Sequence, residues 1–163
     1  MTIRRQTTQD SSAIEDLMAE AFGPSRLSRT VWHLRQGDAV PELCFVQEEE
    51  GVIIGSLRFW PILLGGKIAL LLGPLAIARN YKGKGFGKAL VAHAIACASQ
   101  MSYHAILVSG EPDYYPQFGF MPASPSEFLW PGFIEEERLQ ILWLAEEATP
   151  LMPGVKAILP TGA

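Results

Sequence analysis

Three glycines and three lysines alternate in one short segment, directly before a stretch with helical periodicity. The segment is Lys82-Gly83-Lys84-Gly85-Phe86-Gly87-Lys88. Glycine lets the backbone approach a ligand closely, and a helix N-terminus offers unpaired N–H groups and a favourable dipole. The segment therefore predicts a binding site for a pyrophosphate group. A solvated basic turn without a ligand is the alternative.

The charges around this segment are sorted along the chain. Residues 1–50 carry five basic and nine acidic side chains, residues 51–110 carry six basic and none acidic, and residues 111–163 carry two basic and eight acidic, for a net charge of −4. A cationic island in an acidic chain favours a bound anion over a nucleic-acid surface, which needs a broader basic face. Two common phosphate loops are excluded, because G-x-G-x-x-G does not fit from Gly85 and the P-loop needs Ser or Thr where Ala89 stands.

Composition and local sequence argue against a disordered chain, a metal-binding protein and a membrane-spanning protein. Hydrophobic residues make up 48% of the 163 and charged residues 18%, which predicts one folded domain spanning 1–163. Three histidines and two cysteines without close spacing predict no metal site. The longest nearly apolar run, 68–78, is shorter than the roughly 20 residues of a membrane span, and polar residues follow Arg4-Arg5 where a signal peptide would be apolar. We expect a cytoplasmic protein with no nucleic-acid or membrane partner.

The elements that must position the glycine-rich segment follow from hydrophobic periodicity. Strands are expected at 3–7, 43–46, 52–64, 67–77, 105–108, 127–129 and 139–144, and helices at 11–22, 27–36, from the glycine-rich segment to about 101, and at 113–117. Gly65-Gly66 predicts a hairpin, and Gly73-Pro74 predicts a bulge inside a strand. His93 shares the apolar face of its helix, which predicts a core histidine. This order indicates an α+β fold, with one mixed sheet and helices on both faces.

With these motifs in place, the sequence resembles the GNAT superfamily of N-acetyltransferases. Its acetyl-CoA signature, [Q/R]-x-x-G-x-[G/A], reads Lys82-Gly83-Lys84-Gly85-Phe86-Gly87 here, with lysine where the family usually has Gln or Arg. The segments Leu71–Ile77 (LLGPLAI) and 113–120 (DYYPQFGF) resemble a bacterial branch of predicted acetyltransferases that reads LLGPLAV and YYxxFGF. The resemblance runs from about Ile3 to Pro122. It implies an antiparallel meander followed by a splayed pair of parallel strands.

The resemblance implies acetyl-CoA as co-substrate, and no metal. Pantetheine and acetyl groups would lie along the backbone of Leu75, Ala76 and Ile77. The amides of Gly83, Lys84, Gly85, Phe86, Gly87 and Lys88 would bind the pyrophosphate. Lys82, Lys84 or Arg79 would assist at the 3′-phosphate. A bulge at Gly73-Pro74 would leave an N–H to stabilise the oxyanion of a tetrahedral intermediate.

The same resemblance implies a general acid. The family often protonates the departing thiolate with a tyrosine four residues before a Gly-Phe pair, which is Tyr115 when the pair is Gly119-Phe120. Tyr115 as a packing aromatic is the alternative, and Tyr114 is the less favoured tyrosine.

The general base is harder to assign, because residues 51–110 contain no carboxylate. Glu111, directly after a predicted strand, is the first choice. Asp113, Glu42, Asp38, His33 and a water-mediated route stay open.

The resemblance implies an enzyme that moves an acetyl group from acetyl-CoA to a primary amine in a ternary complex. The acceptor is a small molecule or a peptide; a polyamine, an amino acid, an antibiotic and a protein N-terminus all fit the sequence. A non-catalytic acyl-CoA sensor of the same fold is the alternative, favoured by the missing carboxylate on the central strands. Phe128, Trp130 and Phe133 are expected to pack in the core, with an acceptor pocket as the alternative. The oligomeric state is left open, a homodimer included.

Overall fold

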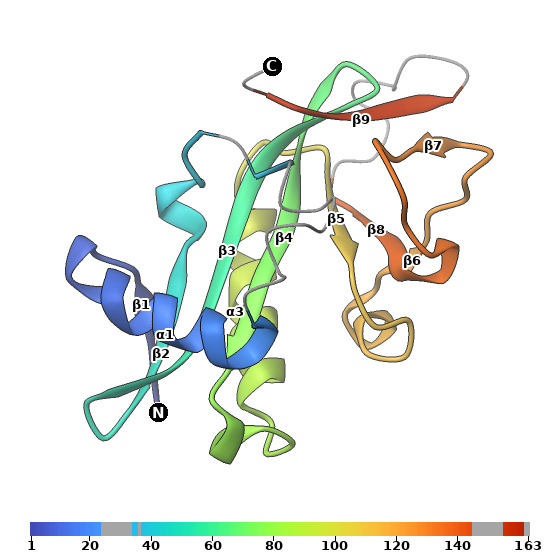
Figure 1. Ribbon diagram of the computed structural model, residues 1–163. Helices are drawn as coiled ribbons and strands as arrows, with labels where there is room; N and C mark the ends of the chain where they lie inside the picture. The colour runs from blue at the N-terminus through green and yellow to red at the C-terminus, as the bar shows by residue number, and fades with distance from the viewer. Residues whose placement is uncertain (24–33, 36, 145–154, 162–163) are drawn as a thin grey trace.

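One mixed sheet of nine strands organises the computed structural model, which describes residues 1–23, 34–35, 37–144 and 155–161 (Figure 1). The strands are β1 (Thr2–Arg5), β2 (Phe45–Glu49), β3 (Val52–Leu64), β4 (Lys67–Ile77), β5 (Ala105–Ser109), β6 (Met121–Pro122), β7 (Phe128–Leu129), β8 (Leu139–Trp143) and β9 (Lys156–Pro160). The two labelled helices are α1 (Ser11–Phe22) and α3 (Phe86–Ser99). The order of the strands in the sheet is β1-β2-β3-β4-β5-β8-β6, and β9 pairs with β3 and β7.

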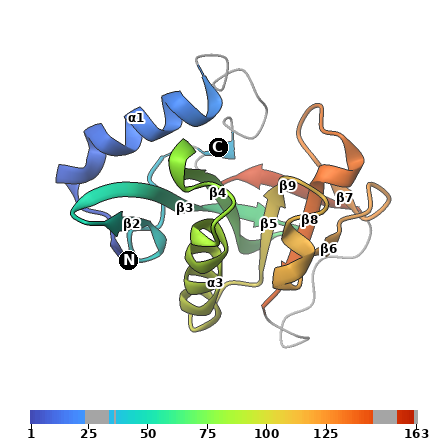
Figure 2. The same cartoon turned by 90° about the horizontal axis from the view of Figure 1, so that it is seen from below.

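The helices α1 and α3 cover opposite faces of this sheet (Figure 2). The buried side of α3, formed by Leu90, Val91, Ala94 and Ala98, joins the core that contains Leu72 of β4. The buried side of α1 packs instead against Val46 and Ala76. Successive side chains of a strand point to opposite faces, so β4 supplies both cores. The predicted α+β class, with helices on both faces, is confirmed.

The central hairpin β3–β4 contains the predicted bulge. Both strands have the predicted bounds, and Gly65 and Gly66, at φ 52° and 84°, form the turn between them. The register changes from Leu57 opposite Leu75 to Phe59 opposite Leu72, so Gly73 and Pro74 together face one residue of β3. One extra residue therefore bends β4 midway along its length.

The parallel strands β4 and β5 pair over a short distance and then separate (Figure 1). Their register consists of Leu70 with Ile106 and Leu71 with Leu107, whereas β4 continues to Ile77. β5 pairs on its other side with β8 from Ala105 to Ser109. The predicted splayed pair is therefore confirmed, and its opening begins at the bulge of β4.

Several element boundaries differ from the sequence prediction. The first strand ends at Arg5 rather than at residue 7, and the second is shifted to Phe45–Glu49, because Glu48 and Glu49 pair with β3 instead of forming the turn. The segment predicted as helix 113–117 forms a 3-10 turn at Tyr115–Phe118. Strands β6 and β9 were not predicted. The predicted helix 27–36 falls almost wholly outside the described residues.

The prediction of a core histidine at position 93 is wrong. His93 is exposed, because Val91 rather than His93 completes the buried face of α3. The imidazole still has a neighbour, since the ring of Phe45 meets it edge-on with centroids 5.0 Å apart.

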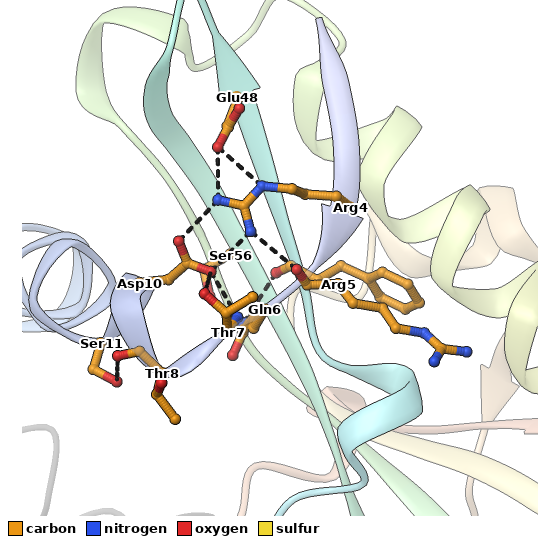
Figure 3. A network of polar contacts seen from close by, with 10 residues as sticks. Arg4, Arg5, Gln6, Thr7, Thr8, Asp10, Ser11, Glu48 and Ser56 are labelled. Atoms are coloured by element: carbon orange, nitrogen blue, oxygen red, sulfur yellow. Dashed lines mark hydrogen bonds and ion pairs between the residues drawn. The ribbon is translucent and has the colours of Figure 1, made fainter.

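An ionic network joins the edge of the sheet to the start of α1 (Figure 3). The guanidinium of Arg4 donates two hydrogen bonds to Asp10, at 2.9 and 2.8 Å, and two more to Glu48 of β2, at 3.0 and 2.6 Å. The amide of Thr7 also donates to Asp10 at 2.7 Å. Chiefly because of the bonds from Arg4, the pKa of Asp10 is lowered from 3.8 to about 2. The network ties the edge strands β1 and β2 to the start of α1.

Candidate active site

The glycine-rich segment forms the turn that leads into α3. Gly83 and Gly85 have φ of 74° and 88°, in the left-handed region that favours glycine, and Gly85 is the N-cap of the helix. An added Cβ at either position would meet no atom within 4 Å, so the backbone conformation, rather than crowding, requires glycine here. The amides of the first helical turn thus begin beside an open space.

That space is a cavity of about 460 Å³, here called the cofactor cleft. It is lined by Leu75, Ile77, Tyr81, Lys82, Gly83, Gly85, Gly87, Lys88, Tyr114 and Gln117. Most residues expected to bind acetyl-CoA therefore lie around one cavity. Four do not line it, and Arg79 is one of them. Ala76 packs toward α1, Lys84 lies 6.0 Å from the ring centre of Tyr81, and Phe86 meets that same ring edge-on.

A second cavity, of about 270 Å³, lies where β4 and β5 separate, and is here called the transfer cavity. It is lined by Phe22, Arg35, Leu72, Gly73, Pro74, Leu75, Val108, Ser109, Gly110, Glu111, Tyr114, Tyr115 and Arg138. Leu75 and Tyr114 line both cavities, so the two adjoin. The hydroxyl of Tyr114 also lies 3.1 Å from where a Cβ on Gly87 would stand, so a side chain at that point of α3 would push the hydroxyl aside by a few tenths of an ångström.

Tyr115 lies in the wall of the transfer cavity and is only 7% exposed. Its ring meets Phe120 edge-on at 5.5 Å, and a Cβ on Gly110 would overlap the ring. Burial in these apolar surroundings raises the pKa of Tyr115 well above its ordinary value, and the opposing effects of Arg138 and Arg35 are smaller. The phenol is therefore neutral near pH 7, and it is both packed and accessible from the cavity.

Glu111 borders the transfer cavity with a side chain that is 74% exposed. Its Oε1 accepts a hydrogen bond from Nη1 of Arg138 at 3.0 Å. The other described candidates for the base, Asp38, Glu42 and Asp113, are exposed and line neither cavity. His33 lies outside the described residues.

Two arginines of the transfer cavity were missed by the sequence analysis. Nη2 of Arg35 lies 2.6 Å from where a Cβ on Gly73 would stand, so this guanidinium covers the bulge of β4. The backbone of Arg138 lies beside the end of β5, where its carbonyl oxygen accepts a hydrogen bond from the amide of Gly110 at 2.9 Å. Nothing in their local sequence distinguishes either from a surface arginine.

The aromatic residues near the C-terminal part of the sheet are divided between core and surface. Phe128 and Trp130 are 4% and 7% exposed and pack in the core, as expected. Phe133 is 83% exposed, which contradicts the expectation of core packing, since its segment contains Pro131-Gly132 and no regular structure.

The comparison with known protein families decides which family this architecture represents. A family model described as "Acetyltransferase (GNAT) family" matches residues 11–120, from α1 to the end of the motif around Tyr115. The chain belongs to the GNAT family of acetyltransferases. The predicted family and the predicted class of enzyme, an acyltransferase, are thereby confirmed.

Individual GNAT relatives extend the likeness over nearly the whole chain. The uncharacterized N-acetyltransferase YhbS of Escherichia coli strain K12 is 28% identical over 159 residues, which are 95% of this chain and 94% of YhbS. The uncharacterized N-acetyltransferase YjhQ of the same strain is 29% identical over 146 residues, 86% of this chain and 80% of YjhQ.

Two solved structures of GNAT proteins have a similar fold. The crystal structure of E. coli YhbS in complex with CoA covers 98% of this chain and 88% of its own, with 27% identity and a TM-score of 0.78. A GNAT family acetyltransferase from Brucella melitensis in complex with acetyl-CoA covers 96% and 94%, with 27% identity and a TM-score of 0.68.

The part of the chain that the structure describes contains neither a candidate membrane-spanning helix nor a candidate metal site. Within it, no helix has both the length and the apolar character needed to cross a bilayer. In the same residues, no three side chains of His, Cys, Asp or Glu are grouped closely enough to hold a metal ion.

Proposed function

We propose that this GNAT protein transfers an acetyl group from acetyl-CoA directly to a primary amine while both substrates are bound. The observation that carries the proposal is the junction of the two cavities at Leu75 and Tyr114. One cavity is bordered by a helix N-terminus suited to phosphate, and the other by a buried phenol and a carboxylate. The CoA and acetyl-CoA complexes of the two related structures support the same assignment of ligand.

The residues of the cofactor cleft fit the two halves of coenzyme A. At one end, Leu75 and Ile77 offer apolar side chains beside strand backbone, which suits a pantetheine arm. At the other, the amides from Gly83 to Lys88 and the charge of Lys82 suit a pyrophosphate. Any of Lys82, Lys84 and Arg79 is able to contribute to binding the 3′-phosphate.

Acetyl-CoA, when bound, supplies an acetyl group already activated as a thioester. The backbone of Leu75, Ala76 and Ile77 orients that group at the mouth of the transfer cavity. An N–H of the bulge after Gly73-Pro74 donates to the carbonyl oxygen as negative charge develops there. Tyr115 donates its phenolic proton to the sulfur as the thiolate leaves, and its raised pKa keeps that proton available.

The incoming amine must be neutral to attack, so a base must take up its proton. Glu111 borders the transfer cavity and is solvent-exposed, so it can accept that proton directly or through a water molecule. Arg138 holds the carboxylate through Oε1, which limits its rotation. Juxtaposition of the amine and the thioester in adjoining cavities contributes further to the rate.

The proposal is tested by two measurements on the purified protein. Calorimetric titration with acetyl-CoA measures binding, and detection of the free thiol of CoA with a panel of primary amines measures transfer. We expect saturable binding and thiol release that depends on at least one amine. Binding without release from any amine would indicate a sensor instead of an enzyme, and absence of binding would refute the cofactor assignment.

A further inference from the structure

The charges that line the transfer cavity restrict which amine can enter it. Its charged side chains in the described residues are Arg35, Arg138 and Glu111, two guanidinium groups against one carboxylate. A polycationic acceptor, such as a polyamine or an aminoglycoside, would have to approach these two guanidinium groups. A zwitterion would not, because it brings a carboxylate together with its amine.

The two guanidinium groups lie on different sides of the opening. Arg35 covers the bulge of β4, with Nη2 against Gly73, and its Nε and Nη1 are buried. Arg138 is next to Gly110, at the end of β5. Both are close enough to Tyr115 to favour its ionised form, as positive charges do at short range. Tyr115 lines the same cavity as both arginines.

Arg138 has binding capacity beyond its ion pair with Glu111. That pair uses Nη1 alone, and among the described residues Nη2 and Nε of Arg138 donate to no other group. The arginine side chain is 23% exposed, whereas that of Glu111 is 74% exposed. A guanidinium with a free edge can bind a second carboxylate through two parallel hydrogen bonds.

The size of the cavity agrees with a small ligand. Its volume of about 270 Å³ is below the roughly 300–1,000 Å³ usual for pockets that hold drug-sized molecules. One amino acid is of suitable size.

From this arrangement we infer that the acceptor is a small primary amine carrying a carboxylate, namely a free amino acid, with its carboxylate bound between Arg35 and Arg138 and its amino group toward Glu111. The inference rests on the proposed acetyl transfer and adds the class of acceptor to it. In the reaction, the amine nitrogen forms a bond to the acetyl carbon and the bond from that carbon to sulfur breaks. The ammonium group of the zwitterion first loses one proton to solvent. The neutral amine then attacks, its remaining excess proton passes to Glu111 and the sulfur receives a proton from Tyr115, which gives an N-acetyl amino acid and CoA. The proton on Glu111 returns through water to the phenolate of Tyr115, so both groups are restored.

The experiment compares matched acceptors in the thiol-release assay. The panel contains the twenty common amino acids, their carboxamides, spermidine, kanamycin and O-phosphoethanolamine. At least one free amino acid is expected to have a kcat/KM at least tenfold above that of its own amide, which lacks only the negative charge. Turnover that is equal or better with the amides, the polycations or the phosphate-bearing amine would overturn the inference while leaving acetyl transfer intact. Absence of thiol release with every amine would instead overturn the proposed function itself.

Variants of the arginines test the site directly. Arg138→Gln and Arg35→Gln should each lower the acid-to-amide ratio of kcat/KM at least tenfold, mainly through a higher KM for the acid. Arg138→Lys, which keeps the charge without the fork, should recover part of the ratio. Arg5→Gln, on an exposed strand edge, is the control and should leave the ratio unchanged. A ratio unaffected in both glutamine variants would contradict the inference, even if either variant were less stable.

Discussion

Removal of the Tyr115 hydroxyl is the sharpest perturbation of the proposed chemistry. Tyr115→Phe deletes one oxygen and leaves the ring, which supplies the contacts with Gly110 and Phe120. Because those contacts persist, we expect the melting temperature to change by only a few degrees, as for other small substitutions without a cavity. Acetyl-CoA should bind with nearly unchanged affinity, since Tyr115 does not line the cofactor cleft.

The size of the kinetic effect follows from the role of the phenol. General acids commonly contribute about 100-fold to 10,000-fold to a rate. The group that leaves here is a thiolate, and an ordinary thiol has a pKa of roughly 8.5, so it needs less help than an alkoxide or an amine. We therefore expect kcat to fall by about 10-fold to 100-fold, equivalent to about 1.4 to 2.7 kcal/mol of transition-state stabilisation.

The dependence of this defect on pH provides a second test. Above roughly pH 8.5 a departing thiolate remains ionised in water, so the difference between Tyr115→Phe and the native protein should become smaller. The assay is thiol release across pH 6 to about 10, with acetyl-CoA affinity measured by calorimetry. Tyr103→Phe, which removes a hydroxyl from a residue that lines neither cavity, is the control. Unaltered turnover in Tyr115→Phe would remove Tyr115 from the mechanism and leave it as a packing aromatic.

Three further substitutions probe the cofactor cleft, the base and the ionic network. Gly85→Asp should weaken acetyl-CoA binding at least 100-fold in calorimetry, through charge repulsion beside the pyrophosphate, whereas the uncharged Gly85→Asn should weaken it far less; equal losses would refute the phosphate assignment. Glu111→Gln should lower kcat at least tenfold near pH 7 with part of the loss recovered at higher pH, where more of the amine is already neutral, and a profile parallel to that of the native protein would exclude Glu111 as the base. Asp10 has a pKa of about 2 in the folded protein against 3.8, so its bond to Arg4 should stabilise the fold by about 1 to 2 kcal/mol above pH 4, and this is lost as the pH falls toward 2. Urea unfolding of Asp10→Asn should therefore show lower stability at pH 7 and a flatter acid dependence, and an unchanged acid dependence would contradict that reasoning.

The central hairpin and the glycine turn could be predicted from sequence because their signals are local. Gly65 and Gly66 supply the positive φ of a tight hairpin, and Gly73-Pro74 interrupts a strand pattern. The bounds of β3 and β4 were therefore correct to the residue. Gly85 at the N-cap of α3 belongs to the same kind of local signal.

The errors arose where contacts distant in sequence decide the outcome. Glu48 reads as part of an acidic turn, but its bonds to Arg4 of the first strand accompany its place in β2. His93 matches the apolar spacing of its helix, yet the sheet covers the face that contains Val91.

Arg35 and Arg138 illustrate the same limit within the site. They are about a hundred residues apart in sequence and are brought to one cavity by the order of strands β4, β5 and β8. Their proximity depends on this topology, which the hydrophobic periodicity of the sequence does not reveal. The tertiary arrangement was thus needed to infer the chemical class of the acceptor, whereas the resemblance at the glycine turn was sufficient to predict the cofactor.

A crystal structure of this protein with bound CoA would test the central claim most directly. We expect the diphosphate on the amides of residues 83–88 and the sulfur at the junction of the two cavities, within hydrogen-bond reach of the Tyr115 hydroxyl. A diphosphate bound elsewhere, or a sulfur separated from Tyr115 by the wall of the cofactor cleft, would contradict it.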